Sequence, residues 1–158
     1  MPDVSFVVEP GDGRATWFDG SLVQDRVIAK CTDGAYAMLE HRAPPGYETP
    51  RHVNHGEKEI RYVLAGEVTA ETPEGRLVAT PGHTLVLKRG HPHRLRVTGA
   101  EPARMLVLFS PAGVEELYHE AGEEAAERAL PDGPTAGAGA FQRLAAEYDV
   151  EVLSDEEG

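Results

Sequence analysis

The pattern of apolar and polar positions changes its period once along the chain. From Tyr36 to Phe109, short alternating or β-branched stretches are separated every few positions by Gly or Pro, which predicts strands joined by turns. Many short strands of this kind are typical of a closed barrel or sandwich, so we expect an all-β fold. The better strand candidates are Ile60–Leu64, Glu67–Glu71, Arg76–Thr80, Thr84–Leu87, Arg94–Thr98 and Met105–Ser110.

After Pro111 the apolar positions follow the spacing of a helix face. Residues 131–140 are rich in Gly, Pro and Ala and are expected to form a flexible connection. We therefore divide the chain into an N-terminal arm with strands (1–35), a barrel core (36–110) and a helical C-terminal tail (111–158). The two predicted helix faces are Val114, Leu117, Tyr118, Ala121 and Phe141, Leu144, Ala145, Tyr148.

Length, charge and cysteine content exclude several classes of protein. A chain of 158 residues, 41% hydrophobic, is enough for one core. A formal net charge of −12 repels phosphate, so neither nucleic acid nor membrane is an expected partner. The single cysteine, Cys31, forms no intrachain disulfide, and a basic signal sequence is not apparent, so we expect a cytoplasmic protein.

Histidines gather in the strand-rich region. Seven occur in the chain, and a single histidine in a strand is more often an ordinary hydrogen-bonded residue than a metal ligand. Residues two apart in a strand share a face, so three polar pairs are expected to point into the barrel from neighbouring strands. These pairs are His52 with Asn54, Glu59 with Arg61, and His91 with His93.

Such a cluster is suited to a metal ion. Buried imidazoles and a carboxylate are costly unless satisfied, and a divalent cation satisfies them together. His52, Glu59 and His93 would form a two-histidine, one-carboxylate set with open coordination positions opposite. Asn54 would add a weak oxygen ligand or hold a metal-bound water.

The spacing of these residues resembles the two motifs of the cupin superfamily. Gly46-x5-His52-x-Asn54-x4-Glu59-x6-Gly66 is similar to the first motif, G-x5-H-x-H-x3,4-E-x6-G, with one replacement. Gly82-x5-Lys88-x-Gly90-x2-His93-x3-Val97 is similar to the second, G-x5-P-x-G-x2-H-x3-N, with two replacements. The flanks look like those of small single-domain bacterial cupins related to quercetin dioxygenase.

The resemblance implies a double-stranded β-helix, the cupin or jelly-roll barrel, usually found as a homodimer. It also implies one divalent metal ion (Fe, Mn, Ni, Co or Zn) held by three histidines and a glutamate. Carried over to this chain, the metal set is His52, Asn54, Glu59 and His93, with Asn54 standing where the third histidine is usual.

The replacement at Asn54 leaves three possibilities open. The metal is held by three protein groups, another histidine fills the position, or the site has lost its metal. His91 is the better substitute because it lies two residues before His93, although Pro92 disturbs that geometry. His55 has the parity of an outward-facing residue.

Arg61 and Tyr47 are the expected substrate-binding residues. Cupins commonly carry an apolar residue at the position of Arg61, so its charge indicates either a bound anion or a salt bridge to Glu59 or Glu48. If Arg61 pairs with Glu59, the carboxylate is diverted from the metal. Tyr47 is expected at the mouth of the barrel.

The resulting hypothesis is a metal-dependent enzyme acting on a small, aromatic or polyketide-like molecule. The leading reading is a quercetinase-like dioxygenase with Glu59 as a base. The first alternative is a non-redox cyclase, isomerase or decarboxylase in which the metal is a Lewis acid and Glu59 or His91 moves a proton. The second is a non-catalytic small-molecule-binding cupin with a degenerate metal site.

Overall fold

β-Strands dominate the chain, as its residue pattern predicts. The computed structural model describes residues 4–154; residues 1–3 and 155–158, at the ends of the expected arm and tail, lie outside the described part. The predicted strands in the motif region are confirmed within about two residues at each end. The strands of residues 15–110 are β1 (Ala15–Phe18), β2 (Ser21–Val27), β3 (Ala37–Ala43), β4 (His52–Asn54), β5 (Lys58–Ala65), β6 (Val68–Thr72), β7 (Gly75–Ala79), β8 (Thr84–Leu87), β9 (Arg94–Val97) and β10 (Ala103–Ser110). A short 3-10 helix, η1 (Ala29–Thr32), joins β2 to β3.

The strands form a jelly-roll sandwich. Two further short strands come from the C-terminal part, β11 (Glu123–Glu124) and β12 (Val150–Val152). One sheet has the order β11-β1-β2-β3-β10-β5-β8, a second consists of β7-β6-β9, and β12 pairs with β4. All pairings between these strands are antiparallel. Because the described strands belong to separate sheets, the structure supports a sandwich, while closure into a barrel stays a prediction.

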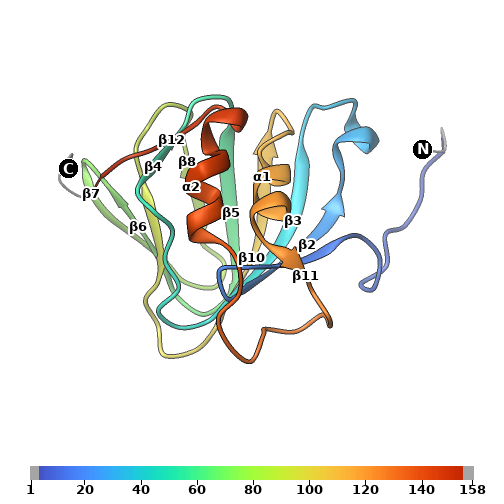
Figure 1. Ribbon diagram of the computed structural model, residues 1–158, viewed down its shortest axis with the longest axis horizontal. Coiled ribbons are helices and arrows are strands. Elements are labelled where there is room, and N and C mark those ends of the chain that lie inside the picture. Colours follow the sequence, from blue (N-terminus) through green and yellow to red (C-terminus); the bar gives the residue numbers. More distant parts are fainter. Residues whose placement is uncertain (1–3, 155–158) are drawn as a thin grey trace.

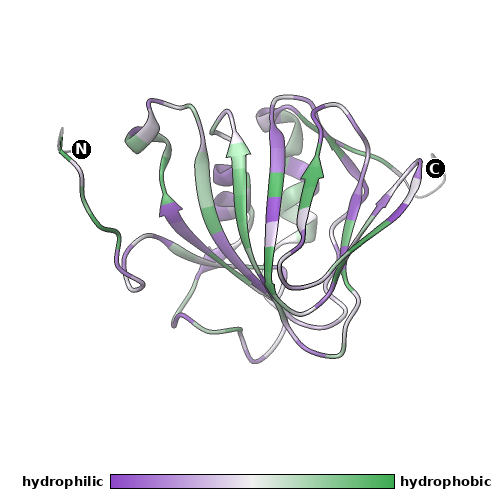
Figure 2. Ribbon diagram, turned by 180° about the vertical axis from the view of Figure 1, so that it is seen from behind, coloured by the Kyte–Doolittle hydropathy of each residue, from purple (hydrophilic) through white to green (hydrophobic). Residues whose placement is uncertain are grey.

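The tail is helical only in part. Helix α1 (Glu115–Ala121), helix α2 (Ala138–Leu144) and the 3-10 helix η2 (Ala145–Tyr148) fall where the two apolar faces are predicted. The tail also contributes β11 (Glu123–Glu124) to β1 and β12 (Val150–Val152) to β4, which a purely helical tail does not anticipate. Helix α2 begins inside the segment 131–140 that was expected to be a flexible connection. Both helices lie on the same side of the sheets (Figure 1), and the view from behind shows the strands in front of them (Figure 2).

Aromatic packing fixes the helices to the strands. Phe18 of β1 contacts Tyr118 of α1 and Phe141 of α2, with ring centroids 5.0 and 5.9 Å apart. All three side chains are almost fully buried, and burying such rings is among the larger contributions to a core. The helices therefore cover one side of the sandwich interior.

Gly66 shows why the first motif ends in glycine. It has a φ of 80° after β5, a conformation that glycine adopts readily. A Cβ atom there would lie 2.7 Å from the carbonyl oxygen of Pro102 and 2.8 Å from the Cα of Ala103. The strand exit therefore depends on a residue without a side chain.

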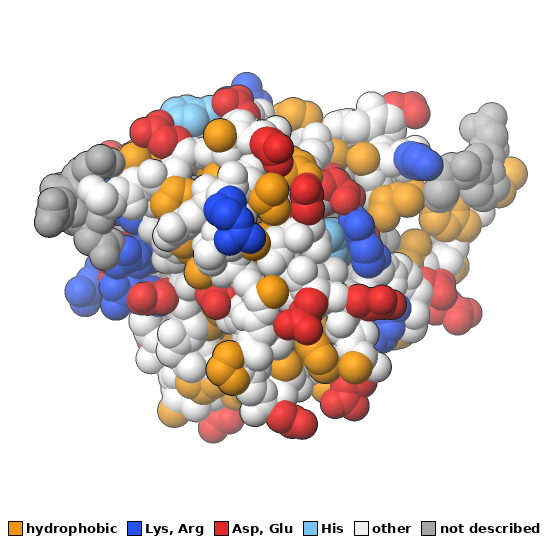
Figure 3. All heavy atoms as spheres, in the orientation of Figure 1, with side chains coloured by type: hydrophobic (Ala, Val, Ile, Leu, Met, Phe, Trp, Pro, Cys, Tyr) orange, Lys and Arg blue, Asp and Glu red, His pale blue; other side chains and the backbone are white. Residues whose placement is uncertain are grey.

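The surface reflects the acidic composition. Acidic side chains are scattered over the helical face with fewer basic ones between them (Figure 3). No helix in residues 4–154 is long and apolar enough to cross a membrane.

Candidate functional site

The structure brings the motif residues together inside the sandwich. His52 and Asn54 lie on β4, Glu59 and Arg61 on β5, and His93 just before β9. The backbones of His52 and His93 form an isolated antiparallel bridge, in which His52 N donates to His93 O (3.0 Å) and His93 N donates to His52 O (2.9 Å). All five side chains are nearly fully buried, between 1% and 3% exposed. Five of the six residues in the predicted polar pairs therefore lie in the interior, and His91 does not.

The two histidines form an edge-to-face pair with ring centroids 4.5 Å apart. Nδ1 of His52 lies 2.7 Å from the carbonyl oxygen of Pro50, which can only accept, so Nδ1 carries the proton of the neutral ring. Nε2 of His52 is then a lone pair, and within the described residues it is buried without a hydrogen-bond partner; the same holds for Nδ1 of His93. Buried polar atoms without partners are rare in native proteins and mark candidate ligand contacts.

Both rings are held neutral by their surroundings. Burial and the neighbouring His93 lower the pKa of His52 to about 4. Burial also lowers the pKa of His93, against the opposing charge of Glu59 and an interaction with the backbone of His91. Neutral imidazoles at pH 7 have a lone pair that can accept a proton or bind a cation.

Each carboxylate oxygen of Glu59 accepts one hydrogen bond from a neighbour. Asn54 Nδ2 donates to Glu59 Oε1 (3.1 Å) and Arg61 Nε donates to Glu59 Oε2 (2.5 Å). The Arg61 and Glu59 side chains are only 3% and 2% exposed. Burial favours the neutral acid, but the charge of Arg61 prevails and lowers the pKa of Glu59 to about 2. Of the readings of Arg61, the structure therefore shows the salt bridge to Glu59; Glu48 pairs instead with Arg96.

His41 is a site residue that the sequence analysis missed. Its ring Nδ1 lies 3.0 Å from Arg61 Nη1 and its Nε2 lies 2.9 Å from Ser21 Oγ. Because arginine can only donate, Nδ1 accepts and Nε2 carries the proton. Burial and the charge of Arg61 lower the pKa of His41 to about 3. Its signal was the alternation of Leu39 and His41 on one strand face, outside both motifs.

These contacts decide whether the residues fit a divalent metal ion. Both carboxylate oxygens of Glu59 already accept hydrogen bonds, and a buried guanidinium lies beside them, which repels a cation. Within residues 4–154, no group of three or more His, Cys, Asp or Glu side chains is placed to hold a metal. The arrangement does not fit the metal set His52, Asn54, Glu59 and His93, although the lone pair of His52 remains available. Metal ligation by these residues stays a prediction that requires Glu59 to leave Arg61.

His91 does not take the place of the missing histidine. Its backbone N donates to the carbonyl of Lys88 (3.3 Å), so the segment turns there and β9 begins only at Arg94. The strand parity that would align His91 with His93 is therefore lost, and His91 is exposed.

His91 and His93 nevertheless line one cavity. It has a volume of about 290 Å³ and lies where the edge strand β8 approaches β7. Leu77, Val86 and Leu87 supply apolar wall, and Lys88 supplies a cation. This is close to the lower end of the usual volume for a small-molecule pocket.

Two further buried residues, Tyr47 and Glu57, lie near the site. Tyr47 is buried rather than at the mouth, 5% exposed, with its ring edge-on to His41 at 5.3 Å. Glu57 was not predicted, yet it is 4% exposed with Oε1 unpartnered among the described residues. Burial and the nearby Glu59 raise its pKa to about 7. The only sequence signal for the burial of Glu57 is its position two residues before Glu59, which is the spacing of residues that share a strand face.

Comparisons with known proteins agree with this fold. A family model described as a cupin domain matches residues 39–109. No curated protein matches the chain. A predicted oxalate decarboxylase from Thermotoga maritima is 18% identical, with 68% of this chain and 100% of that chain covered and a TM-score of 0.61.

Two other solved structures cover more of the chain. Ectoine synthase from P. lautus is 20% identical over 81% of this chain and 95% of its own, with a TM-score of 0.60. The polyketide cyclase RemF from Streptomyces resistomycificus is 17% identical over 92% and 96%, with a TM-score of 0.59. At these identities the likeness concerns the fold alone. The cupin-domain match covers residues 39–109, which is less than half of the chain.

Proposed function

We propose that the protein is an enzyme that moves a proton on a small organic molecule, with His93 as the group that meets the substrate in the 290 Å³ cavity. The observation that carries this proposal is the pair of buried neutral histidines with unpartnered ring nitrogens. A neutral imidazole keeps its lone pair at pH 7 and can accept a proton from a substrate, with the nearby charge of Glu59 offsetting part of the loss of basicity that burial causes at His93.

The cavity lining suggests the substrate class. Leu77, Val86 and Leu87 favour an apolar body. Lys88 and His91 supply groups that can bind a carbonyl or carboxylate, and Glu74 also lines the cavity. An aromatic or polyketide-like oxo acid has both features. Isomerisation, cyclisation and decarboxylation all need a proton to be moved next to such a carbonyl, and the names of the similar structures include a decarboxylase and a cyclase.

Glu59 has a supporting role in this proposal. Its carboxylate, held by Arg61 and Asn54, keeps a negative charge near the two histidines. That charge would stabilise His93 at the moment it takes a proton, because Glu59 already raises the pKa of His93. Glu59 is thus an electrostatic partner rather than the proton-transfer group itself. The quercetinase-like dioxygenase reading needs a metal that these contacts do not accommodate.

The test is proton exchange without oxygen. The protein is incubated in D2O under argon, with a chelator, with a panel of small aromatic oxo acids and phenols, and proton NMR follows deuterium entering the C–H next to the carbonyl. We expect exchange with wild type and its loss, by roughly 100-fold or more, in His93→Gln. His83→Gln is the matched control, since His83 is exposed and accepts a hydrogen bond from Thr80 N.

Two outcomes would contradict the proposal. Turnover that requires oxygen would favour the dioxygenase. Binding without any turnover, measured by thermal shift on the same panel, would favour the second candidate, a small-molecule-binding cupin. That candidate is favoured by the buried Arg61–Glu59 pair, which leaves the interior carboxylate already satisfied.

A further inference from the structure

Two departures from the cupin pattern act on the same carboxylate. Asn54 stands where the motif has a histidine, and Arg61 stands two residues after the motif glutamate. In the structure, each of them donates to a different oxygen of Glu59: Asn54 to Oε1 and Arg61 to Oε2. The two residues therefore complete one hydrogen-bonding arrangement.

Arg61 also meets the charge requirement of the site. Glu59 is ionised and buried, and such a carboxylate needs a positive partner. Arg61 supplies a fixed guanidinium with a side chain only 3% exposed. Its other contacts hold it there, since Nη1 lies 3.0 Å from His41 Nδ1 and 3.6 Å from Met105 Sδ. The guanidinium is consequently part of the core and not a surface group that swings aside.

We infer that Arg61 and Asn54 together take the place of a divalent metal ion, with the guanidinium replacing the ionic charge and both donors closing the carboxylate to a cation. His52 and His93 would then keep their lone pairs for a ligand other than metal. The inference is independent of the proposed function, because metal content is measured without a substrate.

The experiment restores the two motif-like residues. Wild type, Asn54→His, Arg61→Met and the double variant Asn54→His/Arg61→Met are loaded with cobalt(II), desalted, and measured by elemental analysis and by the visible absorption of the bound ion. Methionine is chosen because it is long and apolar and fits beside Met105. Circular dichroism and thermal unfolding show which variants are folded.

We expect wild type to retain substoichiometric cobalt and the double variant to retain about one ion per chain, with affinity roughly 10- to 100-fold above wild type. The single variants should fall between. Arg96→Met is the matched control. Arg96 also pairs with a glutamate, in this case Glu71 on the neighbouring strand β6 (3.1 Å), and its replacement should leave cobalt retention unchanged.

Either of two results would overturn the inference. One is stoichiometric cobalt in wild type that is lost in His93→Ala, because the guanidinium would then not exclude the ion. The other is a folded double variant that retains no more cobalt than wild type. If the double variant does not fold, Asn54→His/Arg61→Gln replaces it, and the wild-type measurement is decisive in either case.

Discussion

Two buried histidine regions differ in how their ring nitrogens are used. On helix α1, His119 has both ring nitrogens hydrogen-bonded to β1 and β2: Nδ1 lies 2.5 Å from Thr16 Oγ1 and Nε2 lies 2.7 Å from Asp25 Oδ1. Inside the sandwich, His52 and His93 each leave a buried nitrogen without a partner among the described residues. Burial is similar in both regions, so what separates a structural histidine from a candidate functional one is its unsatisfied hydrogen-bonding capacity.

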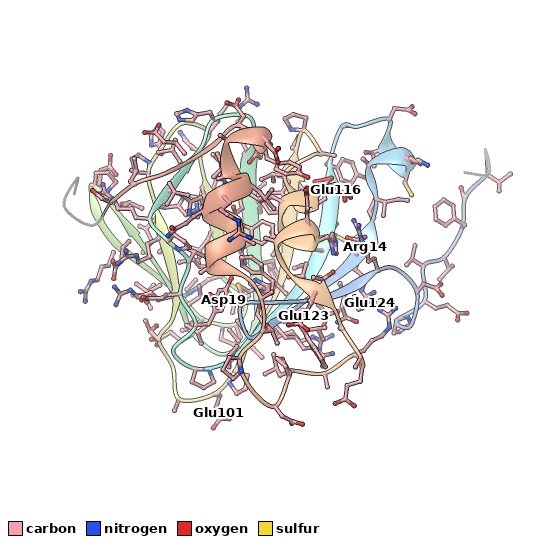
Figure 4. The ribbon with its side chains drawn as sticks, in the orientation of Figure 1. Arg14, Asp19, Glu101, Glu116, Glu123 and Glu124 are labelled. Carbon is pink, nitrogen blue, oxygen red and sulfur yellow. The ribbon has the colours of Figure 1, made fainter. Side chains whose placement is uncertain are left out.

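The surroundings of His119 strengthen this contrast. Arg14 lies beside Glu116 on α1 (Figure 4), donates to both of its carboxylate oxygens at 2.7 Å, and lies 3.6 Å from Asp25. These contacts join α1 to the β1–β2 hairpin through paired charges and hydrogen bonds. The side chains between α1 and the β1–β2 hairpin thus satisfy one another's hydrogen bonds and charges, which stabilises the fold. In the sandwich interior, by contrast, ring nitrogens of His52 and His93 lack a partner among the described residues.

The largest expected effect comes from breaking the Arg61–Glu59 pair. Arg61→Met leaves Glu59 as a buried carboxylate without its cation, which should cost about 3–5 kcal/mol of unfolding free energy. Urea denaturation measures the loss. Arg96→Met, at a half-exposed pair, should lose no more than about 1 kcal/mol. Equal losses of unfolding free energy in the two variants would show that the buried Arg61–Glu59 pair contributes no more to stability than the Arg96–Glu71 pair.

The next effect separates the two histidine regions directly. Asp25→Ala removes the acceptor of His119 and should lower the free energy of unfolding by about 1–3 kcal/mol, with ligand binding in the 290 Å³ cavity unchanged. His93→Gln should show the reverse, a smaller loss of stability together with loss of proton transfer. Thermal shift and the exchange assay, applied to both variants, measure the difference. A His93→Gln variant that still catalyses proton exchange would contradict the functional role proposed for the histidines of the sandwich interior.

The fold was largely predictable because its signals are local. The alternation of apolar and polar residues predicted β5 to β10, and apolar residues at helical spacing predicted α1 and α2. The strands β11 and β12 were missed because each is at most three residues long and forms only through pairing with a strand distant in the sequence. Pairing with a strand that is distant in the sequence cannot be predicted from the local pattern of apolar and polar residues.

The sequence predicted most of the residues that come together in the site, but it did not predict which hydrogen bonds and ion pairs they form. Motif spacing placed His52, Glu59 and His93 together, as the structure has them. The Arg61–Glu59 salt bridge within β5 was one of two alternatives for Arg61, and the side-chain conformations that decide between them are not encoded in the motif spacing. His41 was missed because it contacts Arg61 from a different strand, β3, which is distant in the sequence. His91 was misjudged because a turn at Lys88 breaks the strand parity on which the prediction rested.

The pH dependence of stability is spread over several pH units and is therefore the smallest effect at any single pH near neutrality. His52 has a pKa of about 4 in the folded protein and about 6.5 when unfolded. Because the folded pKa is the lower one, the unfolded state binds more protons between these values. The stability that comes from neutral His52 is complete above pH 6.5 and is lost as the pH falls towards 4, at up to roughly 1.4 kcal/mol per pH unit.

His52→Gln should therefore flatten the fall in unfolding free energy between pH 6.5 and 4 without abolishing it. The remainder comes from His41, whose pKa is lowered to about 3, and from His93, whose pKa burial also lowers; both residues are present in the variant. Glu59 acts in a separate window: its pKa of about 2 means that its contribution is present above its usual value and disappears only as the pH falls through 2. Urea titrations at several pH values test this, and a variant with the wild-type slope would mean that His52 is not the buried neutral base that its contact with Pro50 indicates.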